Sequence, residues 1–266
     1  MVTKEEIQTY IQSIPPAPST LQNVLLQLNA GELSKAASVA NDDPALKLYL
    51  QNVVNKPIFG FQNDLKNLGQ IFGVLGLAQA EQLIYNYMIS LLSPKKWELF
   101  VLNEKNFCEV QNTLSVFWKK ILEHKDINDK TIYSSISLLS ASIIVCEALF
   151  KDKKDDVLLL RGLKEIDYST ILQRLSGMSL YNLCDEIAKT WEMPELISRI
   201  VLASSGKTDE KDPQILELAK WMHLLFFYQL SQPVCVKSGL NDFLDFNIDF
   251  VEDIYEEFQS LMMDES

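Results

Sequence analysis

The stretch Asp42-Asp43-Pro44-Ala45-Leu46 predicts the start of a helix with one buried face. The Asp43 carboxylate can accept a hydrogen bond from a backbone N–H of the first turn, and Pro44 fits the first helical position because its missing N–H is not needed there. The apolar face that follows at helical spacing consists of Leu46, Leu50, Val53 and Val54. Lys56-Pro57 then ends the helix, and Phe59-Gly60-Phe61 forms a loop.

Caps and apolar stripes of the same kind recur on both sides, and strand-like alternation is absent, so the sequence predicts an all-α chain. Upstream, Pro15, Pro16 and Pro18 extend the chain before a helix that Ser19 caps and Gly31 ends. Leu33 to Val39 suggests another short helix. Another helix is expected from Asp64, with a break at Gly76. The later helices are expected over 79–92, 106–124, 132–150, 158–163, 170–175, 180–191, 194–203 and 213–230. Asp167 and Ser169 are candidate caps of the helix over 170–175, and Ser179 opens the helix over 180–191.

Composition restricts the partners and the location of the chain. A formal net charge of -12 over 266 residues repels polyanions, so we expect no nucleic-acid binding. The N-terminus lacks a signal-peptide pattern, and the apolar stretch 135–150 is too short and interrupted to span a bilayer, so we expect no membrane insertion. The four cysteines are widely spaced and are expected to be reduced thiols in a cytoplasmic protein.

An ordered set of short motifs resembles the HDOD domain, a relative of the HD-type metal-dependent phosphohydrolases. The set comprises Pro15-Pro16, Asp43-Pro44-Ala45-Leu46, Asn55, Phe59-Gly60, Leu75-Gly76-Leu77 and Trp191 followed by Pro194. The resemblance covers 12–206 and implies a multi-helical bundle with an N-terminal lobe over 12–105 and an HD-like lobe over 106–206. We expect 207–266 to add helices that pack on the same core and end in an acidic helix.

The same resemblance locates the positions where HD hydrolases hold metal. Lys120 stands where the first histidine would be, Ser140-Ala141 replaces the H-D pair, Leu180 replaces the next histidine, and Ser204-Ser205 replaces a His-His pair. These side chains are poor metal ligands or none. The resemblance therefore implies a family member without a catalytic site, metal or cofactor.

The chain has only two histidines, and neither has an H-D or H-x-x-x-H neighbour. His223, within an apolar run, is interpreted as a hydrogen-bonded packing residue rather than a metal ligand. His124 is interpreted as a surface residue at a helix end. No phosphate-binding glycine loop or nucleophile elbow appears in the sequence.

Three functions remain open from the sequence. The first is a non-catalytic module of bacterial signal transduction that binds signalling proteins. The second is a sensor that binds a nucleotide or another anion through Lys120, Ser140, Ser204 and Ser205. The third is a residual phosphohydrolase, which would require metal. The acidic C-terminal helix either docks its apolar stripe on its own chain or binds a partner.

Overall fold

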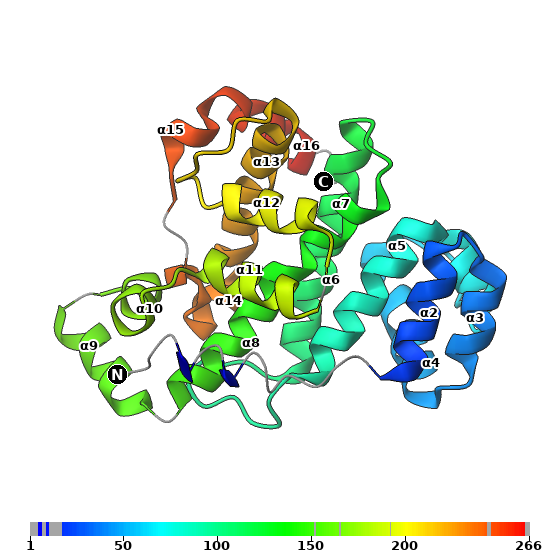
Figure 1. Cartoon of the computed structure of the whole chain (residues 1–266), viewed down its shortest axis with the longest axis horizontal. Helices are drawn as coiled ribbons and strands as arrows, with labels where there is room; N and C mark the ends of the chain where they lie inside the picture. Colours follow the sequence, from blue (N-terminus) through cyan, green and yellow to red (C-terminus); the bar gives the residue numbers. More distant parts are fainter. Residues whose placement is uncertain are drawn as a thin grey trace.

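The computed structural model describes residues 5–6, 9–10, 18–151, 153–164, 166–191, 193–243 and 246–263. Every regular element within these ranges is helical, which confirms the predicted all-α class (Figure 1). Pro15 and Pro16 of the expected family motif lie outside the described residues.

The N-terminal lobe packs three helices and a 3-10 turn against a fourth helix. These elements are α2 (Ser19–Asn29), α3 (Leu33–Asn41), α4 (Pro44–Val54), the 3-10 helix η1 (Pro57–Phe59) and α5 (Leu68–Leu91). Their buried apolar side chains, from Leu21 to Met88, form one hydrophobic cluster. Figure 1 shows this lobe as a separate group of blue and cyan helices at one end of the molecule.

The larger lobe contains all later helices. They are α6 (Glu104–His124), α7 (Lys130–Ser135), α8 (Ser137–Lys151), α9 (Lys154–Lys164), α10 (Tyr168–Ser176), α11 (Leu180–Thr190), α12 (Glu195–Ala203), α13 (Pro213–Leu230), α14 (Pro233–Ser238), η2 (Leu240–Phe243), α15 (Ile248–Val251), η3 (Glu252–Ile254) and α16 (Tyr255–Met263). A second cluster of buried residues runs from Ile89 to Met262. The two clusters therefore meet inside α5, whereas the sequence suggests a lobe boundary at 105/106.

The helix start at Asp43 forms as expected. The Asp43 Oδ1 accepts hydrogen bonds from the backbone N–H groups of Ala45 at 2.9 Å and Leu46 at 3.0 Å, with Pro44 as the first helical residue. At the other end of α4, the Asn55 side chain binds both backbone groups of Leu65: its Oδ1 accepts from the N–H at 2.7 Å, and its Nδ2 donates to the carbonyl at 3.1 Å. Asn55 therefore closes the loop between α4 and α5.

Four predictions about helix starts, caps and continuity are wrong. The helix expected from Asp64 begins at Leu68 and is capped by Asn67, because Asn55 already holds the backbone of Leu65. Pro18, not Ser19, occupies the N-cap position of α2, and the Asp167 side chain, not that of Ser169, caps α10. The helix expected over 132–150 is two helices that join at Ile136.

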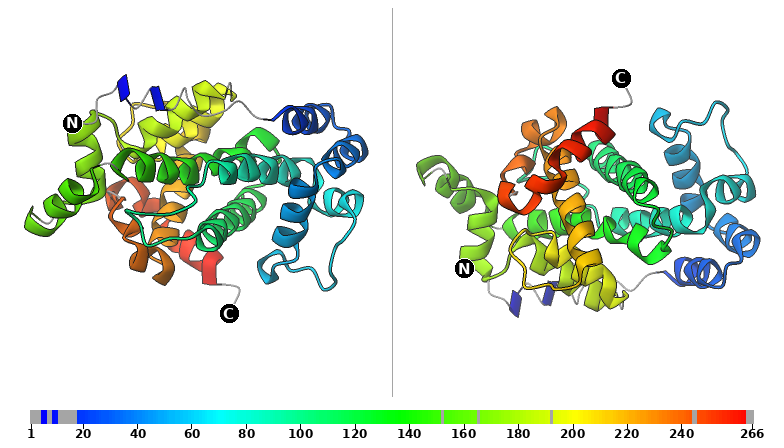
Figure 2. Two further views of the ribbon diagram at one scale, coloured as in Figure 1. Left: turned by 90° about the horizontal axis from the view of Figure 1, so that it is seen from below. Right: turned by 90° about the horizontal axis from the view of Figure 1, so that it is seen from above.

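The break expected at Gly76 is confirmed. This glycine has φ 71° and ψ 176°, which interrupts the helical backbone within α5. The buried apolar side chains of α5 belong to the N-terminal cluster on both sides of the break, as far as Met88, and Ile89 is the first buried residue of the larger cluster. Figure 2 shows the cyan and teal helix passing from the N-terminal helices toward the larger lobe.

A buried carboxylate holds the long connection between α5 and α6. Glu147 on α8 is 1% exposed and accepts hydrogen bonds from the backbone N–H groups of Leu99 and Phe100, both at 3.0 Å. Three N–H groups in a row, from residues 98 to 100, point at this carboxylate. Ion–dipole bonds of this kind are stronger than neutral ones, so this connection is held firmly on α8.

The C-terminal helix docks on its own chain. Phe258 and Met262 of α16 are buried, and the Phe258 ring lies 6.0 Å from that of Trp221 on α13. Acidic residues flank the contact, where Asp253 pairs with Lys220 at 2.6 Å.

The segment 130–151 has the length and apolar composition of a membrane span, but 89% of its most apolar window is buried inside the protein. It forms the central helices α7 and α8 of the larger core.

Candidate functional site

Ser140 and Ala141, at the expected H-D pair, lie in the protein interior. Both are 1% exposed on α8. The Ser140 hydroxyl donates to the Ser137 carbonyl at 2.8 Å and accepts from Gln111 Nε2 on α6 at 3.3 Å. It is therefore a member of a buried network of polar groups.

This buried polar network continues to α5. Asn86, 1% exposed, donates from Nδ2 to the Ser115 hydroxyl at 2.8 Å and accepts from the Ser137 hydroxyl at 2.8 Å. Its carbonyl accepts from Gln111 at 3.4 Å. The network ties α5, α6 and α8 together at the junction of the two hydrophobic clusters.

Lys120 does not join Ser140. Helices α6 and α8 run antiparallel, with Gln111 opposite Ser140, while the Trp118 indole N–H donates to the Ile132 carbonyl at 2.9 Å. Lys120 is nine positions beyond Gln111, or roughly 13 Å along the helix. Nine positions are also about two and a half helical turns, so Lys120 leaves α6 on the side opposite Gln111, and the first histidine position and the H-D position do not meet.

The other three positions lie around the starts and ends of α11 and α12. Leu180 is the first residue of α11 and is 1% exposed. The Ser204 hydroxyl donates to the Val201 carbonyl at 2.7 Å, and the Ser205 hydroxyl donates to the Lys207 carbonyl at 3.2 Å. Both hydroxyls are thus engaged by nearby backbone.

Leu180 and Ser205 share one hollow of about 440 Å³, whose rim carries the cations Arg174 and Lys207. Lys120 and Ser140 do not line it. The set Lys120, Ser140, Ala141, Leu180, Ser204 and Ser205 therefore forms no common pocket, and its chemistry does not fit a divalent metal, because it offers no imidazole or carboxylate.

His223 is a satisfied core residue, as the sequence suggests. It is 0% exposed on α13. Its Nδ1–H donates to the Ser204 carbonyl at 2.9 Å, and its Nε2 accepts from the Asn247 backbone N–H at 3.2 Å, a pattern that assigns the neutral tautomer. The ring also stacks on Phe246, with centroids 5.4 Å apart.

His124 lies in the last turn of α6, with its side chain 38% exposed, and its Nε2 lies 2.7 Å from Glu257 of α16. Within the described ranges, no three His, Cys, Asp or Glu side chains lie close enough together to hold a metal ion.

The four cysteines are free thiols, and three of them are buried. Burial raises the pKa of Cys184 to about 12 and that of Cys235 to about 11. These thiols are therefore protonated and serve as packing groups.

The remaining motif residues build the scaffold. Gly60 ends η1 in the left-handed conformation with φ 71°, and Phe59 packs against the N-terminal cluster. Trp191 ends α11, and Pro194 precedes the first residue of α12. None of these residues belongs to the hollow beside Leu180.

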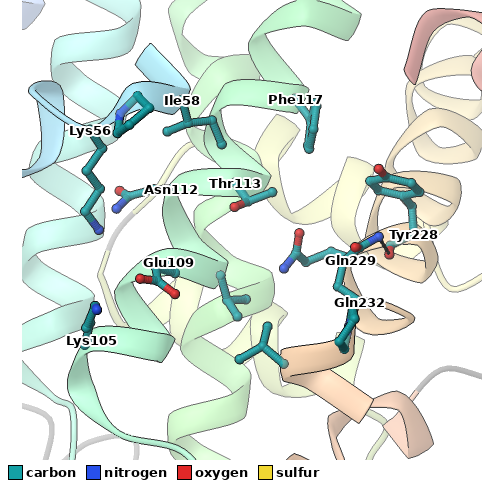
Figure 3. A pocket seen from close by; sticks show the side chains of 14 residues that line it. Lys56, Ile58, Lys105, Glu109, Asn112, Thr113, Phe117, Tyr228, Gln229 and Gln232 are labelled. Atoms are coloured by element: carbon teal, nitrogen blue, oxygen red, sulfur yellow. Dashed lines mark hydrogen bonds between the residues drawn. The ribbon is translucent and has the colours of Figure 1, made fainter. Parts of the chain in front are cut away.

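Sequence reasoning missed a groove of about 740 Å³ between the two lobes. Figure 3 shows it between η1, α6 and the junction of α13 with α14. Lys56, Lys105 and Glu109 lie on one side, and Tyr228, Gln229 and Gln232 lie on the other. The lining segments are far apart in the sequence, so no local pattern predicts the groove.

The HDOD domain family matches residues 13–206, and the chain belongs to this family. The crystal structure of an HDOD domain protein with unknown function from Geobacter sulfurreducens is similar, with a TM-score of 0.67 and 16% sequence identity over 97% of this chain and 94% of that chain. At this identity the likeness shows the fold alone.

A second crystal structure, of a virulence factor from Campylobacter jejuni subsp. jejuni, matches with a TM-score of 0.49 and 16% identity, over 97% of this chain and 96% of that chain. No curated protein matches this chain significantly.

Proposed function

We propose that this HDOD protein is a non-catalytic regulatory module of bacterial signal transduction that acts in the cytoplasm through contacts with signalling proteins. The observation that supports the proposal is the environment of Ser140 at the H-D position. Its hydroxyl is buried in a hydrogen-bond network with Gln111 and Ser137, where it helps to hold helices together. A residue in that position has a structural task and offers no substrate contact.

The test is affinity capture from the native organism with the full chain as bait. We expect the same signalling protein or small set of proteins in every repeat, with direct binding reproduced by the purified pair. Repeated recovery of no specific protein would count against an interaction module. Stoichiometric Fe, Mn or Zn in the purified protein, together with turnover of a phosphodiester, would instead favour a residual phosphohydrolase.

The second candidate function is a nucleotide sensor. The hollow that contains Leu180 and Ser205 favours it, because Arg174 and Lys207 place two cations at its rim. The lining comes from α10, α11 and the loop after α12, so an anion bound there would bridge separate elements. Thermal-shift screening against linear and cyclic nucleotides tests this candidate: binding raises the melting temperature, and an Arg174→Ala variant should lose that rise. A flat panel would discard it.

A further inference from the structure

Two buried amide side chains in the groove between the lobes have unused hydrogen-bonding groups. Asn112 is 2% exposed, and neither its Oδ1 nor its Nδ2 forms a hydrogen bond within the described residues. Gln229 is also 2% exposed, and its Oε1 likewise lacks a partner in this part of the chain. A buried polar group left unpaired costs about 1–3 kcal/mol. A ligand that supplies both a donor and an acceptor would remove this cost.

The groove is long and largely apolar. Along α6 its lining extends from Lys105 to Phe117, twelve positions or about 18 Å. That length matches five or six residues of extended chain at about 3.3 Å each. The apolar part of the lining includes Ile58, Val110 and Val234. An extended peptide presents alternating side chains to such walls and a backbone N–H and C=O to each amide.

One side of the groove is basic. Lys56 and Lys105 lie there with Glu109 between them, as Figure 3 shows. Neither lysine forms an ion pair within the described ranges. This side thus carries more positive than negative charge in a chain of net charge -12. A carboxylate on the ligand would be attracted to the pair of ammonium groups.

We propose that the groove binds an extended peptide segment of about six residues from a partner protein, with apolar side chains and an Asp or Glu near one end. The acidic residue contacts Lys56 and Lys105, and the peptide backbone pairs with Asn112 and Gln229. The assignment rests on the proposed interaction function and adds the place and chemistry of the contact.

The test uses the full chain and a synthetic array of hexapeptides with varied apolar positions and an Asp, Glu, Lys or Gln at each end. We expect the protein to select peptides with one acidic end. The best hexapeptide, labelled with a fluorophore, is then titrated by fluorescence polarisation. Selection of no hexapeptide, or of basic-ended ones, would overturn the proposal.

Asn112→Leu is the decisive variant, because leucine has a similar size and no polar atoms. We expect at least a tenfold weaker affinity for the hexapeptide, while the melting temperature stays unchanged or rises since an unpaired amide has been removed. A purely structural Asn112 would leave the affinity unchanged. A nucleotide whose stabilising effect disappears in Asn112→Leu would also overturn the peptide assignment.

A charge swap tests the basic side. Lys56→Glu/Lys105→Glu should weaken binding of the acidic hexapeptide at least tenfold and restore binding when its acidic residue is replaced by lysine. Each single variant, Lys56→Glu or Lys105→Glu, is also compared with Lys35→Glu on α3, whose side chain is 65% exposed and lies outside the groove. Equal losses in the single groove variants and in Lys35→Glu would show a general charge effect and reject the assigned contact.

Photo-crosslinking separates failure of the groove from failure of the proposed function. A photoreactive residue replaces Ile58 at the groove or, as control, Leu159 on α9, which is 58% exposed. We expect crosslinks to a captured partner at Ile58 only, and competition by the selected hexapeptide. Crosslinks at Leu159 alone would leave the interaction function standing and reject the groove, and capture at neither site in repeated trials would count against both.

Discussion

His223 and Asn112 are both buried polar residues, yet their surroundings differ. Both ring nitrogens of His223 have hydrogen-bond partners, on Ser204 and Asn247, so the residue is a structural cross-link between α12, α13 and α15. The Asn112 amide has none within the described residues. An unpaired buried amide lowers stability, and the place of Asn112 in the lining of the groove supports the proposed peptide site.

His223→Ala should lower the free energy of unfolding by about 2–4 kcal/mol, because it removes a buried ring and leaves two backbone groups without partners. Urea denaturation measures this loss. The control is His124→Ala. The His124 side chain is 38% exposed and forms its ion pair with Glu257 at the surface, so we expect a change below about 1 kcal/mol. Equal losses would contradict the structural role of His223.

Glu210 should make the stability of the folded protein depend on pH in the acidic range. Its carboxylate accepts two hydrogen bonds from the Arg199 guanidinium, at 2.9 and 3.0 Å, and others from the backbone N–H groups of Lys211 and Asp212. The guanidinium first, and then the backbone donors, lower the pKa of Glu210 to about 2.

Because this folded-state pKa lies below the unfolded value of about 4.3, the stabilisation is present above that pH and is lost as the pH falls toward the folded value. Glu210→Gln should therefore show a smaller loss of stability than the unmodified chain across this window. The measurement is the urea midpoint at a series of acidic pH values. Parallel curves for the two proteins would contradict the expectation.

At the scale of elements, the break in helix α5 depends on one glycine, Gly76. The backbone of Gly76, at φ 71° and ψ 176°, lies in a region that only glycine adopts readily. The interruption kinks the helix inside the N-terminal cluster, which holds Leu75 before the kink and Ala80 after it. Gly73, three residues earlier on the same helix, has ordinary helical geometry and open space around its α-carbon.

These two glycines form a matched pair. Gly76→Ala should destabilise the protein by about 1–3 kcal/mol through backbone strain. Gly73→Ala should be neutral or stabilise by up to about 1 kcal/mol, because alanine favours an exposed helical position. Thermal or urea unfolding of the two variants decides the matter. Destabilisation by both, to the same extent, would show that helix packing rather than the Gly76 backbone sets the effect.

Elements with local signals could be predicted from the sequence. Asp43-Pro44, Gly76 and Ser179 act on neighbouring backbone, and all three behave as expected. The start of α5 was misplaced because Asn55, ten residues away from Leu65, holds that residue outside the helix. A hydrogen bond between a side chain and the backbone of a residue ten positions away does not produce a periodic pattern in the sequence.

At the scale of the whole molecule, the Asn86 network joins the lobes. Asn86→Ala would leave the hydroxyls of Ser115 and Ser137 without their partner on α5, and we expect a loss of about 2–4 kcal/mol in unfolding free energy. All four tryptophans belong to or pack against the hydrophobic cluster of the larger lobe. During urea unfolding, tryptophan fluorescence therefore reports the larger lobe, whereas far-UV circular dichroism reports the helices of both lobes. The two midpoints should coincide only while the lobes remain coupled.

The candidate sites were harder to predict than the fold, because they depend on how distant helices align. The family resemblance implies that Lys120 and Ser140 occupy positions of one former site, but the pairing of Gln111 with Ser140 separates them. The groove requires η1, α6 and α13 to converge. No single segment carries the information for that convergence.

The contact between His223 and the Ser204 carbonyl also bears on which part of this chain folds independently. The family match ends at residue 206, yet α13 begins at Pro213 and contributes the fully buried Trp221 and Phe226 to the larger core. A fragment of residues 13–206 would expose that core to water. We expect it to keep helical far-UV circular dichroism but to lose its near-UV signal and bind a hydrophobic dye. The segment that folds on its own is therefore expected to be longer than the segment that the family match covers.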